Sequence, residues 1–190
     1  MLNSLNNHLR QFSSRRAFIA LLLAYSIYMP IFFFANVPFG ISAIRPYAAG
    51  TNILDVEFFY TATQAYDRFT LFGEQGRATY LTILKGDLVY PALLGSLLAV
   101  SICLIVKRLN PSRVGWQYLA LLPLVNMVCD YCENFLLFVL LLSYPTHLPT
   151  VASVAGVVTL TKNIFGILSF ATLAFGLLAM LIRYFWPLRA

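Results

Sequence analysis

The sequence predicts an all-α polytopic membrane protein: four transmembrane helices with an amphipathic helical cap on the non-cytoplasmic side. Hydrophobic residues make up 60% of the 190-residue chain and charged residues only 11%, whereas soluble domains average about 25% charged residues. The mean hydropathy is +0.78, and four apolar stretches reach the roughly 20 residues that cross a bilayer. These stretches leave no room for a separate soluble domain, so we expect one membrane domain over residues 1–190.

The four predicted spans cover residues 17–39, 87–106, 116–143 and 151–184. The first span follows Arg15 and Arg16, a pair that resembles a twin-arginine export signal. Its apolar run is longer than a signal-peptide core and lacks a persuasive cleavage site, so we interpret it as a retained span. The second span carries Pro91 near its start, where proline either kinks a helix or ends it.

Basic residues predict the orientation of these spans. They fall in the N-terminal tail, in the loop between the second and third spans, and at the C-terminus: Arg10, Arg15, Arg16, Lys107, Arg108, Arg113, Arg183 and Arg189. These three segments contain no acid, and Lys and Arg accumulate on the cytoplasmic side of membranes. We therefore expect an integral protein of a bacterial inner (plasma) membrane with both termini in the cytoplasm. The net charge of +6 then reflects orientation, and without a basic face carrying interleaved aromatic residues no nucleic-acid partner is expected.

The only long connection is the outer amphipathic segment, residues 41–86. Within residues 55–70, apolar side chains recur at three- and four-residue spacing, which predicts a helix able to lie along the membrane surface. The members of this stripe are Phe58, Ala62, Ala65 and Phe69. Gly73 and Gly76 predict a turn, and a second helical stretch begins near Arg77 and leads toward the second span.

The third predicted span carries four polar side chains in its middle, where hydrocarbon is expected. They are Asn126, Asp130, Glu133 and Asn134. Positions three and four apart share one face of a helix. An ionisable group at bilayer depth costs a few kcal/mol, so this stripe is expected to face the bundle interior or a wet cavity. With a rise of about 1.5 Å per residue, Lys162 in the fourth span lies at a similar depth, which makes it the predicted partner of Asp130 or Glu133.

Two acids facing one amine predict that one carboxyl group keeps its proton. A protonated acid beside a paired one is the arrangement that acid–base chemistry or proton coupling uses. Asp130, Glu133 and Lys162 are therefore the candidate catalytic residues. The candidate ligand-binding residues are the polar side chains around them: Asn126, Asn134, Asp87, Tyr90 and Asn163. Alternatively, these polar groups only fasten the helices together, each contributing about 1 kcal/mol.

Cysteine and histidine provide weaker candidate sites. Cys129 and Cys132 form a C-x-x-C pair, a spacing found in redox proteins. Their predicted mid-membrane position, however, favours a role as small apolar packing residues. A metal site would need Asp130, Glu133 and His147, and His147 lies about 20 Å from Asp130 by helical rise. We expect no metal and no cofactor.

Two stretches carry a family resemblance. The first is residues 76–80 (GRATY), followed by Asp87 and Pro91, and the second is residues 130–134 (DYCEN), followed by Tyr144 and Pro145. They resemble small uncharacterised four-pass bacterial membrane proteins over about residues 76–162, a resemblance that implies no activity. In architecture alone, a small helix bundle with inward-facing acids is similar to sterol-isomerase-like proteins with four to five spans.

Three functions fit these observations, and whether the protein is an enzyme stays open at this point. In the first, an intramembrane polar pocket binds an apolar, lipid-like molecule from the surrounding membrane lipid, or acts on it by acid–base chemistry. In the second, the protein is a structural or accessory subunit whose buried polar cluster only holds helices together. The third is proton-coupled transport, for which four spans are few unless the chain forms a homo-oligomer.

Overall fold

The computed structural model describes residues 8–109 and 114–185, and those residues form helices and connections without any strand. The elements, in chain order, are α2 (Arg15–Phe34), η1 (Ile41–Tyr47), η2 (Leu54–Val56), α3 (Ala62–Asp87), α4 (Tyr90–Leu109), α5 (Val114–Gln117), η3 (Tyr118–Leu121), α6 (Leu122–Ser143) and α7 (Pro149–Phe185). Helices labelled η are short 3₁₀ helices. The part of the chain that is described is therefore all-helical, as predicted.

Four helical stretches are long and apolar enough to cross a membrane: Arg15–Phe34, Ala62–Leu109, Gly115–Ser143 and Pro149–Phe185. Their number agrees with the four predicted spans, although some ends of the helices differ from the predicted bounds. The first helix ends at Phe34 because the backbone becomes extended at Ala35 (ψ 147°). The helix α4 begins at Tyr90, which places Pro91 in its first turn, where a missing N–H costs no hydrogen bond.

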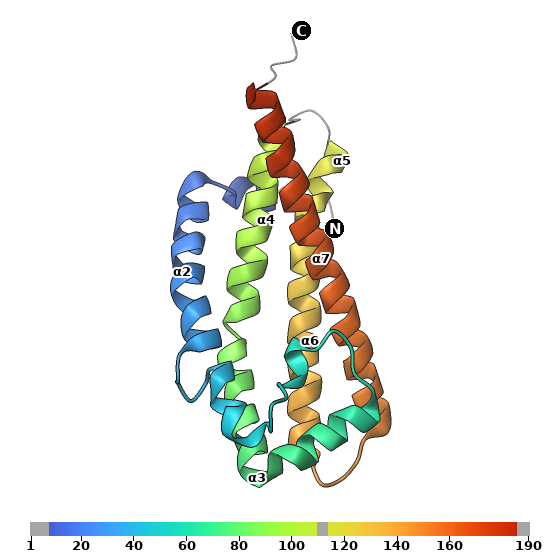
Figure 1. Ribbon diagram of the computed structural model, residues 1–190. Helices are drawn as coiled ribbons and strands as arrows, with labels where there is room; N and C mark the ends of the chain where they lie inside the picture. The colour runs from blue at the N-terminus through green and yellow to red at the C-terminus, as the bar shows by residue number, and fades with distance from the viewer. Residues whose placement is uncertain (1–7, 110–113, 186–190) are drawn as a thin grey trace.

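Figure 1 shows α2, α4, α6 and α7 running side by side, with α2 resting on α4 at the edge of the bundle. The first half of α3 lies across one end of the bundle, near η1 and η2, and its second half leads into α4. The basic ends of α2, α4 and α7 lie together at the opposite end, which we call the basic end. Two of the basic residues used to predict orientation, Arg113 and Arg189, lie outside the described residues.

The helix of the outer segment begins later than predicted, at Ala62 instead of residue 55. Thr61 and Gln64 form a capping box: the Thr61 Oγ1 accepts from the Gln64 N–H at 3.3 Å, and the Gln64 Oε1 accepts from the Thr61 N–H at 2.8 Å. Phe58, from the predicted stripe, consequently lies outside the helix and is exposed. Ala65 and Phe69 are fully buried.

The turn predicted from two glycines occurs at only one of them. Gly73 has a φ of +63°, a conformation that glycine adopts without strain, and it breaks α3 into two parts. Gly76 is helical, and a Cβ added there would lie 2.8 Å from the Cβ of Tyr47. Gly76 therefore serves the close packing of α3 against η1.

The core lies where the outer segment, which includes most of α3, meets α6 and α7. Its largest fully buried side chains include Tyr60, Phe69, Tyr80 and Leu137. By contrast, α2 and α7 expose apolar side chains along much of their length, as expected for surfaces that contact hydrocarbon. The candidate functional residues lie at the edge of this core, between α6, α7 and η2.

Candidate functional site

The polar stripe of α6 faces the interior of the bundle, as predicted. Asp130, Glu133 and Asn134 are buried, whereas Val128 and Phe135 on the opposite side of the helix are exposed. Buried and exposed positions alternate at helical spacing because residues three and four apart share a face. Other apolar side chains of α6, such as Leu137 and Leu140, are buried in the core.

Lys162 of α7 contacts both acids of this stripe. Its Nζ lies 3.4 Å from the Asp130 Oδ1 and forms an ion pair with the Glu133 Oε2. The predicted pairing of Lys162 with one of these acids is confirmed, and it extends to both. Thr159, one turn earlier on α7, donates from its Oγ1 to the Glu133 Oε1 at 2.5 Å. The Glu133 carboxylate is therefore held by two side chains of α7.

Asp55 is a member of this site that sequence reasoning missed. The Lys162 Nζ donates to its backbone oxygen at 3.0 Å, and the Tyr80 hydroxyl donates to its carboxyl Oδ1 at 2.8 Å. Burial raises the pKa of the Asp55 carboxyl to about 7, the Glu133 charge adds to this effect, and Lys162 and Tyr80 oppose it. The one local signal was an acid set between Leu54 and Val56 in an apolar run.

Asp87, the last residue of α3, is connected to the site by a hydrogen bond from Asn134 of α6. The Asn134 Nδ2 donates to the Asp87 Oδ2 at 2.6 Å, and this bond lies in the interior. The other amide atom, Asn134 Oδ1, is buried and has no hydrogen-bond partner among the described residues. Asp87 and Asn134, both predicted ligand-binding residues, therefore lie together.

The site as a whole contains four acids and one base. We call Asp55, Asp87, Asp130, Glu133 and Lys162 the acid cluster. Within the described ranges, no second cation forms an ion pair with these four acids. If all groups were ionised, the acid cluster would carry a net charge of −3, the difference between one positive and four negative charges.

Three other predicted ligand-binding residues make different contacts. The Asn126 Nδ2 donates to the Lys162 backbone oxygen at 2.8 Å, which ties α6 to α7. The Asn163 Nδ2 donates to the Glu57 backbone oxygen at 3.0 Å and so holds the outer segment. The Tyr90 ring packs against Phe33 of α2, with ring centroids 5.1 Å apart.

Cys129 and Cys132 directly precede Asp130 and Glu133 in α6, whereas His147 lies beyond the end of that helix. Cys132 is exposed and Cys129 is half-buried, and both thiols are free. The His147 ring stacks on Tyr66 with centroids 3.9 Å apart, in the connection between α6 and α7. Across residues 8–109 and 114–185, no three His, Cys, Asp or Glu side chains are grouped so that they could hold a metal ion.

Two grooves lie beside α4 near the basic end, with volumes of about 510 and 330 Å³. Neither groove is lined by a residue of the acid cluster. Lys162 instead contacts the Asp130 and Glu133 side chains and the backbone of η2, and the Asp55 and Asp87 side chains contact Tyr80 and Asn134. Any ligand of this site therefore meets a closely packed group of side chains.

These observations define a helical protein with four helices that could cross a membrane and with a buried acidic and basic cluster. In comparisons with known proteins, no family model, no curated protein and no solved structure matches the chain.

Proposed function

We propose that this protein is an integral membrane protein in which the acid cluster is an acid–base site for a lipid-like molecule. One observation carries the proposal: four acids and a single ammonium group are linked by ion pairs and hydrogen bonds, and the ammonium group of Lys162 contacts two of the carboxyl groups, those of Asp130 and Glu133. Placing an ionisable group at bilayer depth costs free energy, and such groups usually belong to functional sites. A cluster needed only to join helices would be expected to have balanced charges.

The excess of acids means that the acid cluster stores protons. A net charge of −3 in a medium of low dielectric constant is unfavourable, so neutrality is reached when carboxyl groups retain protons. Because Lys162 contacts both Asp130 and Glu133, it stabilises whichever of the two is ionised. A proton can thus be given up by one carboxyl while the other remains paired, which is the requirement for general acid–base chemistry.

The accessible areas assign different roles to the two acids of α6. The Asp130 side chain keeps 11% of its surface exposed and Lys162 keeps 9%, whereas Glu133 has 0%. Asp130 is therefore the carboxyl that a ligand would touch, and Glu133 acts as a positioning residue through Lys162. A molecule that arrives from the bilayer reaches such a site without crossing water, which favours a lipid-like ligand.

One observation favours a structural role as the second candidate. Lys162 and Asn163 both donate to backbone oxygens of the outer segment, at Asp55 and Glu57. These bonds join η2 to α7 at a point about 20 Å along α7 from its first residue, by helical rise. The acid cluster could then serve only to hold the outer segment on the bundle.

The deciding experiment measures what the purified protein retains. The chain is purified in mild detergent, and bound molecules are identified by mass spectrometry. We expect a lipid-like molecule with the wild-type protein and with the exposed control variants Asp67→Asn and Glu74→Gln. Asp130→Asn should lower its retention by about tenfold or more, since a hydrogen bond to a charged group contributes about 1.5–3 kcal/mol.

The same molecule, once identified, is then offered to the protein to test for turnover. We expect Glu133→Gln to reduce turnover more than retention, because the Glu133 side chain has no exposed surface and acts through Lys162. If Asp130→Asn and Glu133→Gln both fold, retain the molecule and turn it over at the wild-type level, the acid–base proposal is wrong and the structural role remains.

A further inference from the structure

We propose that the groove between α2, α4 and α7 at the basic end binds one anionic phospholipid, with its phosphate group between Arg15 and Arg108. This groove is the larger of the two beside α4, with a volume of about 510 Å³. Sites for small molecules typically have volumes of about 300–1,000 Å³, so it can hold the headgroup region and part of an acyl chain. The acid cluster plays no part in this site, which is independent of the proposed acid–base function.

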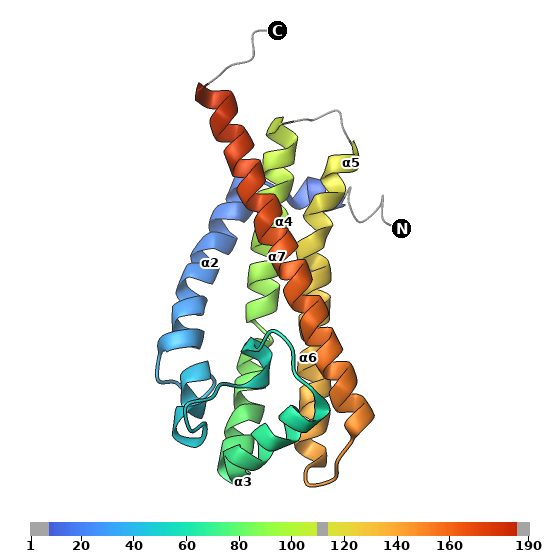
Figure 2. The same ribbon diagram turned by 45° about the vertical axis from the view of Figure 1, so that its right-hand side comes forward.

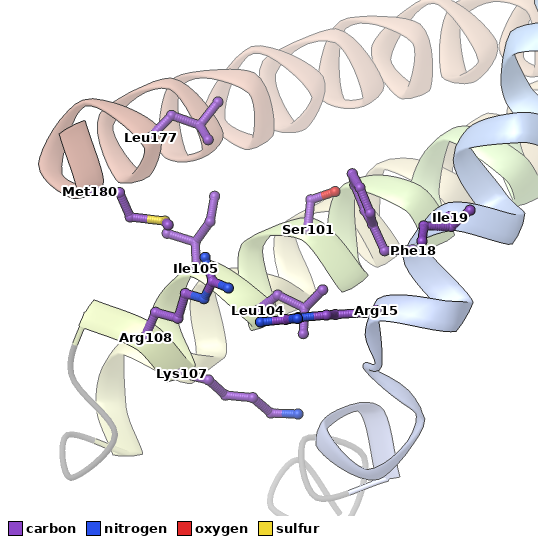
Figure 3. A pocket seen from close by; sticks show the side chains of 10 residues that line it. All are labelled: Arg15, Phe18, Ile19, Ser101, Leu104, Ile105, Lys107, Arg108, Leu177 and Met180. Carbon is purple, nitrogen blue, oxygen red and sulfur yellow. The ribbon is translucent and has the colours of Figure 1, made fainter. Parts of the chain in front are cut away.

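The wall of the groove is apolar. Phe18 of α2, Leu104 and Ile105 of α4, and Leu177 and Met180 of α7 line it (Figure 3). The groove forms because α2 packs on α4 at the edge of the bundle, away from α7, and α4 makes the floor between them (Figures 1 and 2). An unfilled apolar groove would forfeit dispersion contacts along its length, and a lipid acyl chain supplies them.

Two arginines stand at the mouth of the groove. Arg15 is the first residue of α2 and Arg108 is the next to last residue of α4. Both are exposed, and in Figure 3 their side chains reach toward one another from the two helices, near Leu104. The ends of apolar helices lie at the depth of lipid headgroups, so these guanidinium groups are placed where a phosphate would be.

These two charges have no counter-ion within the described residues. Neither guanidinium group forms an ion pair or a side-chain hydrogen bond there, and α2, α4 and α7 contain no acidic residue. The third basic residue of the lining, Lys107, is already engaged: its Nζ donates to the backbone oxygens of Arg10 at 2.6 Å and Ser13 at 3.0 Å. A phosphate group between two guanidinium groups accepts charge-assisted hydrogen bonds from both.

The second groove beside α4 provides an internal comparison. It has a volume of about 330 Å³, and its lining contains no charged residue. It shares Ile105 with the first groove but belongs to the other side of α4, toward Trp116 and Phe175. A lipid tail could lie there without any selection of its headgroup, so only the first groove combines an apolar wall with positive charge.

The test is a lipid titration of the full chain, purified in detergent and freed of its own lipids. Native mass spectrometry follows the binding of phosphatidylglycerol and, separately, of phosphatidylcholine with the same acyl chains. We expect one molecule of phosphatidylglycerol to bind more tightly than phosphatidylcholine. Replacing both arginines (Arg15→Gln with Arg108→Gln) should weaken phosphatidylglycerol binding about 25-fold, or about fivefold for each arginine, and leave phosphatidylcholine unchanged.

Two further variants separate charge from shape. Arg16→Gln removes an exposed charge that does not line the groove, so it should leave lipid binding unchanged. Met180→Trp should fill the groove and weaken the binding of both lipids. Equal affinities for the two lipids, no effect of the double arginine variant, inorganic phosphate binding as tightly as the lipid, or a dimer that excludes lipid would each overturn the proposal.

Discussion

Replacing Lys162 with methionine tests the acid cluster most severely, because it removes the cluster's only cation. Methionine preserves the length of the side chain but leaves Asp130 and Glu133 without their partner, and it leaves the Asp55 backbone oxygen without its donor. Removing one partner of a buried ion pair typically costs about 3–5 kcal/mol. We expect the free energy of unfolding of Lys162→Met to fall by that amount.

A second substitution should restore most of this loss. In the double variant Lys162→Met with Glu133→Gln, the unpaired charge is gone, and the glutamine oxygen can still accept from Thr159. Replacing a buried pair with neutral groups is often tolerated, so the double variant should lie within about 2 kcal/mol of the wild type. Lys85→Met, at an exposed position, is the matched control and should change stability by less than about 0.5 kcal/mol.

The assay is reversible unfolding in mixed micelles, followed by circular dichroism. Limited proteolysis of residues 48–61 gives a second measurement, since Lys162 and Asn163 hold the carbonyl groups of this segment. A loss below about 1 kcal/mol for Lys162→Met would refute the reasoning, because removing one partner of a buried ion pair typically costs about 3–5 kcal/mol. So would a double variant no more stable than the single one.

Three further predictions follow from the fold. Burial raises the pKa of Asp55 from 3.8 to about 7 in the folded state, so its stabilising contribution is complete below pH 3.8 and lost as the pH rises through 7. Thermal unfolding of Asp55→Asn should therefore show a weaker fall in stability across this range, and an unchanged slope would contradict the assignment. Gly156→Ala should lose about 1–3 kcal/mol by the same assay because the added Cβ meets the Tyr60 carbonyl oxygen, whereas Gly115→Ala, with open space around it, should not. Thr61→Ala should lose about 1 kcal/mol of unfolding free energy as the capping box is removed, and an unchanged free energy of unfolding would contradict this cause.

The spans and the inward stripe of α6 could be predicted because they depend on local sequence. The length of an apolar run identifies a helix that can cross a membrane, and three- and four-residue spacing shows which side chains share a face. The depth of Lys162 followed from counting residues along two antiparallel helices joined by a short connection. The pairing of Lys162 with Asp130 or Glu133 could therefore be predicted, whereas the structure shows that it contacts both acids.

Asp55 could not be placed in the same way. It meets Lys162 across 107 positions in the chain, through a short 3₁₀ helix whose path depends on the packing of the whole outer segment. No periodic pattern encodes such a contact. The predicted start of α3 was wrong for a different reason, because the local sequence does contain the signal. The capping box of Thr61 and Gln64 is visible as T-x-x-Q and marks the helix start at Ala62.

The most direct test of the account asks whether the acid cluster holds protons. Infrared spectroscopy of the protein in lipid nanodiscs, recorded as a function of pH, detects protonated carboxyl groups by their carbonyl absorption. The account predicts such an absorption at neutral pH, reduced in Asp130→Asn and in Glu133→Gln and unchanged in Asp67→Asn. A wild-type spectrum without protonated carboxyl groups at neutral pH would contradict it.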